Sequence, residues 1–302
     1  MLDSHSGLAI PTESYFIPQL WARHGRIFDT DAFLEDLGRL ARVREWGVRP
    51  EQVRERLPAS ATPADGIRAI YESYADARGK ARYGDKTPSY MQELDLLERV
   101  FPDAQYVHLV RDGRDTALSF IAMRRRPRFN FARPRGLATF ASQWRLEVEG
   151  ARELGGRMPE RYHELRYEDL VREPQAELER VSDFLGLEFE PAMLAYHEGV
   201  DASTLQDHPL LAKPPTSGTR RWQEQMSGAD VQVFEAIAGD TLSDIGYERA
   251  YPHPTGRARA YGAAVDASYR ARLASWKGSL AEVRRSPAWR VRQAYIRRAA
   301  GA

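Results

Sequence analysis

Apolar residues recur along this chain with two spacings: short continuous or alternating runs, and longer stretches with a repeat of three to four. The short runs at residues 7–10, 105–110 and 161–167 predict β-strands, because buried parallel strands are apolar on both faces. The three-to-four repeat predicts α-helices at residues 29–43, 63–80, 89–100, 113–124, 136–154, 174–186 and 228–246. Alternating strands and helices predict an α/β fold with a mostly parallel sheet covered on both faces.

Local signals predict where some of these helices begin and end. Thr62-Pro63 is a typical helix start, since threonine caps the first amides and proline fits the first turn. The Gly155-Gly156 pair predicts the end of the helix that starts at residue 136. The repeat places Trp144 on the apolar face of that helix.

A candidate phosphate site follows the second strand. Arg111 stands where this apolar run ends, and Ser119 lies about two turns into the next helix. Ligands of open α/β sheets bind at the carboxyl ends of strands, and the planar guanidinium group of arginine matches two phosphate oxygens. The alternative is a buried strand followed by a surface turn in which arginine and aspartate pair with each other. Residues 105–119 alone leave both interpretations open.

Length and composition restrict the class of protein. The chain has 302 residues, 42% of them hydrophobic, and it has no cysteine. It therefore has no disulfide, no thiolate nucleophile and no cysteine-ligated zinc, which fits a reducing cytosol. No apolar run reaches the 18 residues typical of a membrane span, and the first residues do not resemble a secretory signal. We therefore expect a soluble cytoplasmic protein.

Charge is distributed unevenly along the chain. Residues 251–302 contain 11 Lys and Arg against 2 Asp and Glu, a net charge of +9, whereas the rest carries a net charge of −8. We therefore divide the chain into a main domain, 1–254, and a basic helical extension, 255–302. Such an extension could pack on the main domain or contact an anionic membrane or a partner. Nucleic acid is not an expected partner.

Five sequence blocks in a fixed order resemble the sulfotransferase superfamily, whose members transfer a sulfuryl group from 3′-phosphoadenosine-5′-phosphosulfate (PAPS). The blocks are Gly84-Asp85-Lys86-Thr87-Pro88; Phe101-Pro102-Asp103-Ala104 with Arg111 through Ser119; Arg166-Tyr167-Glu168-Asp169-Leu170 with Pro174; Pro214 through Trp222; and Gly246-Tyr247. The pattern is most similar to bacterial sulfotransferases related to the tyrosylprotein type. The resemblance spans roughly residues 1–250 and implies a three-layer α/β/α fold like that of P-loop NTPases.

The family's first motif is missing from the chain. Sulfotransferases begin with a strand and an Arg-Ser-Gly-Thr-Thr-like loop that binds the 5′-phosphosulfate, and neither this loop nor a Walker lysine motif occurs here. Leu2-Asp3-Ser4-His5 resembles the turn that comes directly after that loop. We therefore expect an N-terminally incomplete domain, or a gene that has lost the loop, with impaired activity. The missing Walker motif also weighs against a kinase-type transferase.

The resemblance implies two catalytic residues. Lys86 would contact the bridging oxygen and act on the leaving phosphate, and Glu13 matches the general base of tyrosylprotein-type enzymes. Where small-molecule sulfotransferases carry a catalytic histidine, this chain has Pro88. The alternatives are an ordinary turn lysine and a surface or helix-capping glutamate.

The resemblance also implies the residues that bind the nucleotide. Arg111 and Ser119 would hold the 3′-phosphate, and Tyr167 would contact the adenine unless it simply packs on the core. Lys213, Arg220 and Arg221 belong to the loop that closes over the nucleotide, although at least one of them is expected to be solvated.

No metal is expected, because cationic side chains can neutralise the leaving group and no cluster of ligands has metal spacing. His108 is expected to be a hydrogen-bonded core histidine. The leading hypothesis is a PAPS-dependent sulfotransferase that acts on a hydroxyl acceptor and releases adenosine 3′,5′-bisphosphate. The alternative is a noncatalytic descendant that binds a nucleotide or a partner. The acceptor class and the oligomeric state do not follow from the sequence.

Overall fold

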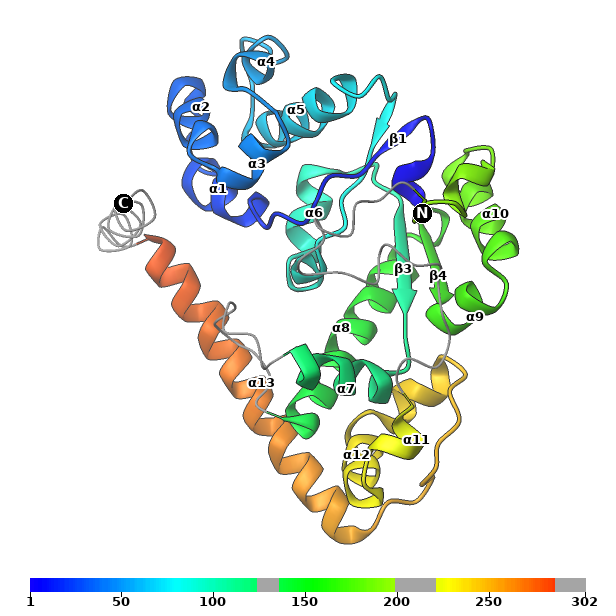
Figure 1. Ribbon diagram of the computed structural model, residues 1–302. Coiled ribbons are helices and arrows are strands. Elements are labelled where there is room, and N and C mark those ends of the chain that lie inside the picture. Colours follow the sequence, from blue (N-terminus) through cyan, green and yellow to red (C-terminus); the bar gives the residue numbers. More distant parts are fainter. Residues whose placement is uncertain (124–135, 199–220, 286–302) are drawn as a thin grey trace. The chain divides into compact units, whose positions relative to one another are not determined.

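A computed structural model describes residues 1–123, 136–198 and 221–285 of the chain, with side chains up to Ser275 (Figure 1). The chain divides into two compact units. The first unit joins residues 1–110 to the segment that begins at Ala151. The second joins Arg111–Gly150 to the segment that begins at Gly218. We describe each unit by itself.

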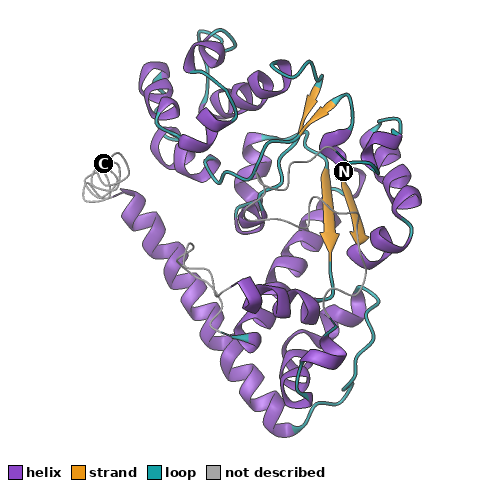
Figure 2. Cartoon of the chain, in the orientation of Figure 1, coloured by secondary structure: helices purple, strands orange, loops and turns teal. Residues whose placement is uncertain are grey.

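All strands of the described residues belong to the first unit and form two parallel pairs (Figure 2). Strand β1 (Leu8–Ala9) pairs with β2 (Arg82–Tyr83), and β3 (Tyr106–Val110) pairs with β4 (Tyr162–Arg166). Parallel strands need long crossover connections, and helices fill these here. The predicted α/β class with parallel strands is therefore confirmed.

The helices of the first unit surround these strands. They are α1 (Ile17–His24), α2 (Thr30–Gly38), α3 (Ala41–Glu45), α4 (Pro50–Arg54), α5 (Pro63–Asp76), α6 (Leu94–Val100), α9 (Tyr167–Arg172) and α10 (Pro174–Leu185). Short 3-10 helices add Leu2–Ser4, Pro88–Gln92, Pro159–Arg161 and Pro191–Met193. Helix α5 starts with the predicted cap, since the Thr62 side chain accepts from the amide of Asp65.

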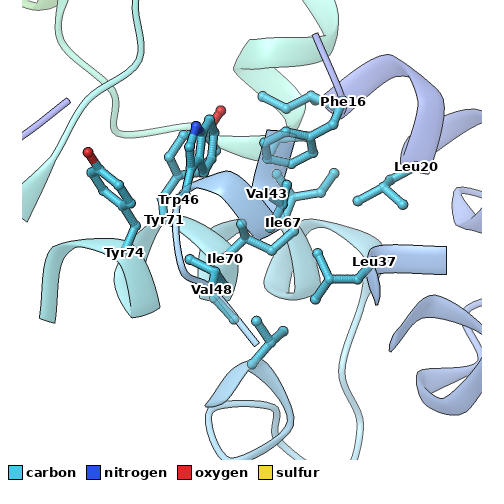
Figure 3. Close-up of a cluster of buried hydrophobic side chains, with 14 of the residues drawn as sticks. Phe16, Leu20, Leu37, Val43, Trp46, Val48, Ile67, Ile70, Tyr71 and Tyr74 are labelled. Atoms are coloured by element: carbon cyan, nitrogen blue, oxygen red, sulfur yellow. The ribbon is translucent and has the colours of Figure 1, made fainter. Parts of the chain in front are cut away.

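An aromatic cluster around α5 forms the main core of this unit (Figure 3). Tyr71 is 1% exposed, and its ring centroid lies 5.5 Å from that of Phe16, 5.6 Å from that of Tyr83 and 5.8 Å from that of Trp46. Aromatic pairs at such distances contribute about 0.5–1.5 kcal/mol beyond their buried area. This cluster fixes α5 relative to the start of α1, the end of α3 and strand β2.

The second unit is helical. It contains α7 (Gly113–Met123), the first part of α8 (Leu137–Arg157), α11 (Trp222–Gln225), α12 (Gly228–Asp244) and α13 (Gly256–Arg285). Trp144 lies on the buried face of α8, as predicted. Asp266 of α13 accepts a hydrogen bond of 2.8 Å from Arg145, while Ala258 and Tyr269 of α13 are buried. The described part of the basic extension is therefore a helix packed on its own unit.

Several predicted helices differ from the observed ones. The helix predicted over 89–100 is divided at Glu93 into the 3-10 helix Pro88–Gln92 and α6, and the helix predicted over 63–80 ends at Asp76. The helix predicted over 29–43 is interrupted after Gly38, a residue of low helix propensity, and Leu40 has an extended backbone with φ −78° and ψ 102°. The predicted stop at Gly155-Gly156 is wrong, because α8 continues to Arg157. A Cβ at position 155 would meet the ring of Tyr162, so this glycine allows close packing instead of ending the helix.

None of the helices among the described residues combines the length and the apolar character needed to cross a membrane. The domain boundary at residue 254 stays a prediction.

The packing around α7 yields a prediction about stability. A Cβ at Gly113 would lie 2.6 Å from the Trp144 ring and 2.8 Å from the Phe234 ring, both buried. Gly113→Ala should therefore lower the free energy of unfolding by about 1–3 kcal/mol, because the added methyl group forces the surrounding side chains and backbone to move from their preferred positions. Gly150→Ala, in α8, meets nothing within 4 Å and should raise it by up to about 1 kcal/mol. Urea denaturation would test both, and equal effects would contradict this account of the packing.

Candidate functional site

The two residues predicted to be catalytic lie together in the first unit. Glu13 follows β1 and Lys86 follows β2, and these strands run parallel, so both loops leave the pair at its carboxyl edge. Lys86 Nζ donates a hydrogen bond to Glu13 Oε1. The side chains are 67% and 40% exposed, so their attraction contributes only about 0–1 kcal/mol and leaves both groups open to a ligand.

The backbone around Glu13 is fixed on both sides. Trp46 Nε1 donates to Thr12 Oγ1 at 3.0 Å, and the amide of Ser14 donates to Thr87 Oγ1 at 3.2 Å. Because Thr87 follows Lys86 directly, the second bond ties the two loops together beside the ion pair. The exposed carboxylate therefore projects from an ordered segment.

Tyr15 has a left-handed backbone with φ 62°. Residues other than glycine adopt this region at a cost of about 1–3 kcal/mol, and they do so where the surroundings require it. This conformation turns the chain from the Glu13 segment into α1, whose N-cap is Phe16. Backbone strain two residues from a candidate base supports a functional role for this loop.

Asp85, next to Lys86, is connected to the core of the unit. Tyr71 Oη donates to Asp85 Oδ2 at 2.8 Å. Burial raises the pKa of Tyr71 well above its ordinary value, so its hydroxyl remains a donor at neutral pH. The acid of the Gly-Asp-Lys-Thr-Pro turn thus anchors the turn on α5.

The predicted phosphate residues belong to the second unit. Arg111 directly follows β3, and its side chain is 24% exposed, with its Nη2 3.8 Å from Asp115 Oδ2. Its carbonyl oxygen accepts a hydrogen bond of 3.2 Å from Trp144 Nε1. Ser119 lies on α7 and is partly buried. Both residues therefore occupy the positions along the strand–turn–helix segment that the sequence indicates.

Asp115 connects Arg111 to the end of the late loop. It accepts a hydrogen bond of 2.8 Å from the amide of Trp222 through Oδ1. Arg221, the residue before Trp222, has a 60% exposed side chain paired with Glu224. The other two basic residues predicted for this loop, Lys213 and Arg220, lie outside the described residues.

A buried charge cluster stabilises this part of the second unit. Arg114 is 1% exposed, donates to Asp112 Oδ2 at 2.7 Å and to Glu235 Oε1 at 2.6 Å, and lies 3.8 Å from the centroid of the Trp222 ring. Glu235 also accepts from the amides of Ala250 and Tyr251 at 3.0 Å and 2.7 Å. The cluster thus links the start of α7 to α11, α12 and the segment after α12.

Tyr167 is the first residue of α9 and directly follows β4. It is partly buried, and Arg166 beside it donates to Asp169 Oδ2 at 2.7 Å, which orders the start of the helix. Val110 of β3 pairs with Arg166 of β4. Arg111 and Tyr167 are therefore the residues that come directly after the last paired residues of β3 and β4.

His108 has a structural role. His108 Nδ1 lies 2.5 Å from the Tyr162 hydroxyl and 3.2 Å from Glu164 Oε2, which agrees with a satisfied core histidine. Within residues 1–123, 136–198 and 221–285, no group of three His, Asp or Glu side chains could hold a metal ion.

Sequence reasoning missed the residues that hold the predicted ones in place. Asp115 and Arg114 each contact Trp222, which lies more than 100 positions later in the chain. The presence of two aspartates in the Arg111–Asp115 segment was the only signal in the sequence that the arginines of this segment form ion pairs.

The buried cluster predicts a large loss of stability on truncation. Arg114→Ala would leave the carboxylates of Asp112 and Glu235 buried without their cation, so the free energy of unfolding should fall by about 3–5 kcal/mol. Arg172→Ala removes an arginine whose side chain is 63% exposed and should change it by less than about 1 kcal/mol. Thermal and urea unfolding of both variants would check this. Similar losses in the two variants would refute a structural role for the cluster.

Comparison with known proteins places the chain in a family. A family model described as "Sulfotransferase family" matches residues 1–191. Nodulation protein NoeE of Sinorhizobium fredii is 27% identical over 283 residues, covering 84% of this chain and 63% of NoeE. Omega-hydroxy-beta-dihydromenaquinone-9 sulfotransferase Stf3 of Mycobacterium tuberculosis is 30% identical over 182 residues, covering 56% of this chain and 42% of Stf3.

The chain thus spans between 42% and 63% of the length of these two relatives. A solved structure, the sulfotransferase domain from the Synechococcus PCC 7002 olefin synthase, superposes with a TM-score of 0.57 at 24% identity. The match covers 80% of this chain and 87% of that domain, and it confirms the predicted fold. The family-model match extends over more than half of the sequence, and the chain belongs to the sulfotransferase family.

Proposed function

We propose that this protein transfers a sulfuryl group from PAPS to a hydroxyl acceptor. The observation that carries the proposal is the contact between Lys86 and Glu13 at the carboxyl edge of β1 and β2. One cationic donor and one carboxylate, both exposed and adjacent, are the two groups that such a transfer requires. In the reaction, the bond between sulfur and the bridging phosphate oxygen breaks, and a bond between sulfur and the acceptor oxygen forms.

Each member of the pair has one task in this scheme. Glu13 accepts the proton of the acceptor hydroxyl as the new bond forms. Lys86 donates a hydrogen bond to the bridging oxygen, which gains negative charge as it leaves with the adenosine 3′,5′-bisphosphate product. The two loops bring the groups together, which serves the positioning that group transfer mainly depends on.

Residues on three segments would bind the nucleotide. Arg111 and Ser119 would bind the 3′-phosphate. The guanidinium group of Arg111 can form charge-assisted hydrogen bonds with phosphate oxygens, and Asp115 beside it orients the side chain. Tyr167 would contact the adenine, and Lys213, Arg220 and Arg221 would lie along the nucleotide in the late loop. These assignments follow from the family resemblance and agree with the observed positions of Arg111 and Tyr167 at strand ends.

The acceptor is a hydroxyl compound whose class the chain does not specify. The name of Stf3 states a menaquinone derivative as its acceptor, whereas the name of NoeE states none. A cytosolic location and a membrane or partner contact through 255–302 stay predictions. No observation favours the noncatalytic alternative.

The nucleotide site predicts a specific binding defect. Titration calorimetry with adenosine 3′,5′-bisphosphate should show binding to the full chain, and Arg111→Ala should weaken it at least about 30-fold, as loss of a charged hydrogen-bonded partner does. Arg172→Ala, an exposed arginine in the first unit, should leave the Kd unchanged. Absence of heat with the unaltered protein at millimolar ligand would overturn the proposed donor.

The catalytic pair predicts a defect in transfer without a defect in binding. Glu13→Gln and Lys86→Met should each lower the rate of sulfuryl transfer from PAPS by about 10²–10⁴-fold. The first removes the group that accepts the proton of the acceptor hydroxyl, and the second removes the cation that donates to the bridging oxygen. Bisphosphate affinity should stay within twofold for Glu13→Gln. Glu173→Gln, a change at a half-exposed surface carboxylate, is the matched control. A Glu13→Gln enzyme with unchanged kcat would exclude Glu13 as the base.

A further inference from the structure

Tyr90 lies beside the loop that carries Glu13, although it belongs to the segment that carries Lys86. It is part of the 3-10 helix Pro88–Gln92 and lies four positions after Lys86 in the chain. Its side chain is buried, with 4% of the residue exposed. A tyrosine buried to this degree normally uses its hydroxyl in a hydrogen bond, because an unsatisfied buried hydroxyl is costly.

The side chain of Tyr90 contacts residues that follow Glu13 directly, and its hydroxyl also interacts with that of Tyr71 on α5. The Tyr90 hydroxyl accepts a hydrogen bond of 3.3 Å from the amide of Ile17 and lies 3.5 Å from Ser14 Oγ. Its ring stacks on Tyr15, with centroids 5.6 Å apart and planes 26° apart. One side chain thus contacts three of the four residues after Glu13.

The bond to Ile17 serves a second purpose. Ile17 is the first residue of α1, where the first amides lack a partner within the helix. Burial raises the pKa of Tyr90 above its ordinary value, so the hydroxyl stays neutral and can both accept and donate. The start of α1 is therefore fixed by a residue of the Lys86 segment.

The left-handed turn at Tyr15 depends on the same segment. Tyr15 Oη donates to Glu93 Oε1 at 2.9 Å, and Glu93 directly follows the 3-10 helix that contains Tyr90. The Tyr15 ring is thus contacted on its face by Tyr90 and at its hydroxyl by Glu93. These contacts supply the surroundings that a non-glycine residue needs to remain at positive φ.

We propose that Tyr90 is a positioning residue that holds the Glu13 loop against the Lys86 loop, so that the carboxylate stays within reach of the lysine. The catalytic consequence rests on the proposed function, whereas the structural consequence does not. A displacement of about 1 Å in such a loop can lower a rate by about 10²-fold.

The test removes one hydroxyl and keeps the ring. Tyr90→Phe preserves the stack on Tyr15 but loses the bond to Ile17, the contact with Ser14 and the interaction with the Tyr71 hydroxyl. The matched control is Tyr74→Phe, at a tyrosine of α5 that is 6% exposed and has its ring on Trp46, with centroids 5.5 Å apart. Both variants lose a hydroxyl from the same aromatic core, and only the first changes the contacts of the Glu13 loop.

Three measurements on the full chain separate positioning from general stability. In Tyr90→Phe, amide hydrogen exchange of residues 10–20 should become about fivefold faster, the change expected for loss of one hydrogen bond. The kcat for sulfuryl transfer should fall about 10- to 100-fold with the acceptor KM within twofold. Bisphosphate affinity should not change. Tyr74→Phe should match the unaltered protein in all three.

Contrary outcomes are equally specific. Unchanged exchange at residues 10–20 in Tyr90→Phe would overturn the proposal, and so would equal losses of kcat in Tyr90→Phe and Tyr74→Phe. Should Tyr90→Phe fail to fold, Tyr15→Phe replaces it. That variant removes the bond to Glu93 and should shift exchange and kcat in the same direction. If the unaltered protein neither transfers a sulfuryl group nor binds adenosine 3′,5′-bisphosphate, the proposed function fails, and the exchange measurement alone decides the role of Tyr90.

Discussion

Parallel pairing of β1 with β2 is the constraint from which the first unit's candidate chemistry follows. The pair is short, yet it makes residues more than 70 positions apart leave the same edge in the same direction. Thr12, Ser14 and Thr87 then connect the two exit loops to each other and to the aromatic core beneath. An exposed ion pair is too weak to organise these loops. The buried contacts around it determine where Glu13 and Lys86 lie, and the ion pair is their result.

The second unit uses a different means to the same end. Where the first unit fixes its loops with aromatic rings and neutral hydroxyls, the second buries a guanidinium between two carboxylates. A buried charge is tolerated only when its partners satisfy it, so the cluster accepts few other arrangements of α7, α11 and α12. This arrangement also involves Arg111, because Asp115 of α7 pairs with the Arg111 side chain and accepts a hydrogen bond from the amide of Trp222.

Much of the secondary structure could be predicted because its causes are local. The Thr62 cap, the apolar run before Arg111 and the repeat that buries Trp144 are all readable within a few residues. Gly155 was misjudged because its neighbour Tyr162 is brought close only by the fold. The same holds for Tyr90, whose partners lie more than 70 positions earlier. The candidate catalytic residues came from family resemblance, while the groups that position them depend on long-range contacts that no local pattern encodes.

The exposure of Lys86 and Glu13 makes their mutual attraction dependent on the surrounding electrolyte. At an ionic strength of 0.15 M the Debye length is about 8 Å, and it shrinks to about 3 Å at 1 M, so dissolved salt weakens contacts between solvent-facing charges. Any small anion in the buffer competes with Glu13 for the ammonium group. The choice of buffer ions therefore sets how much of the protein has this lysine available for a negatively charged donor.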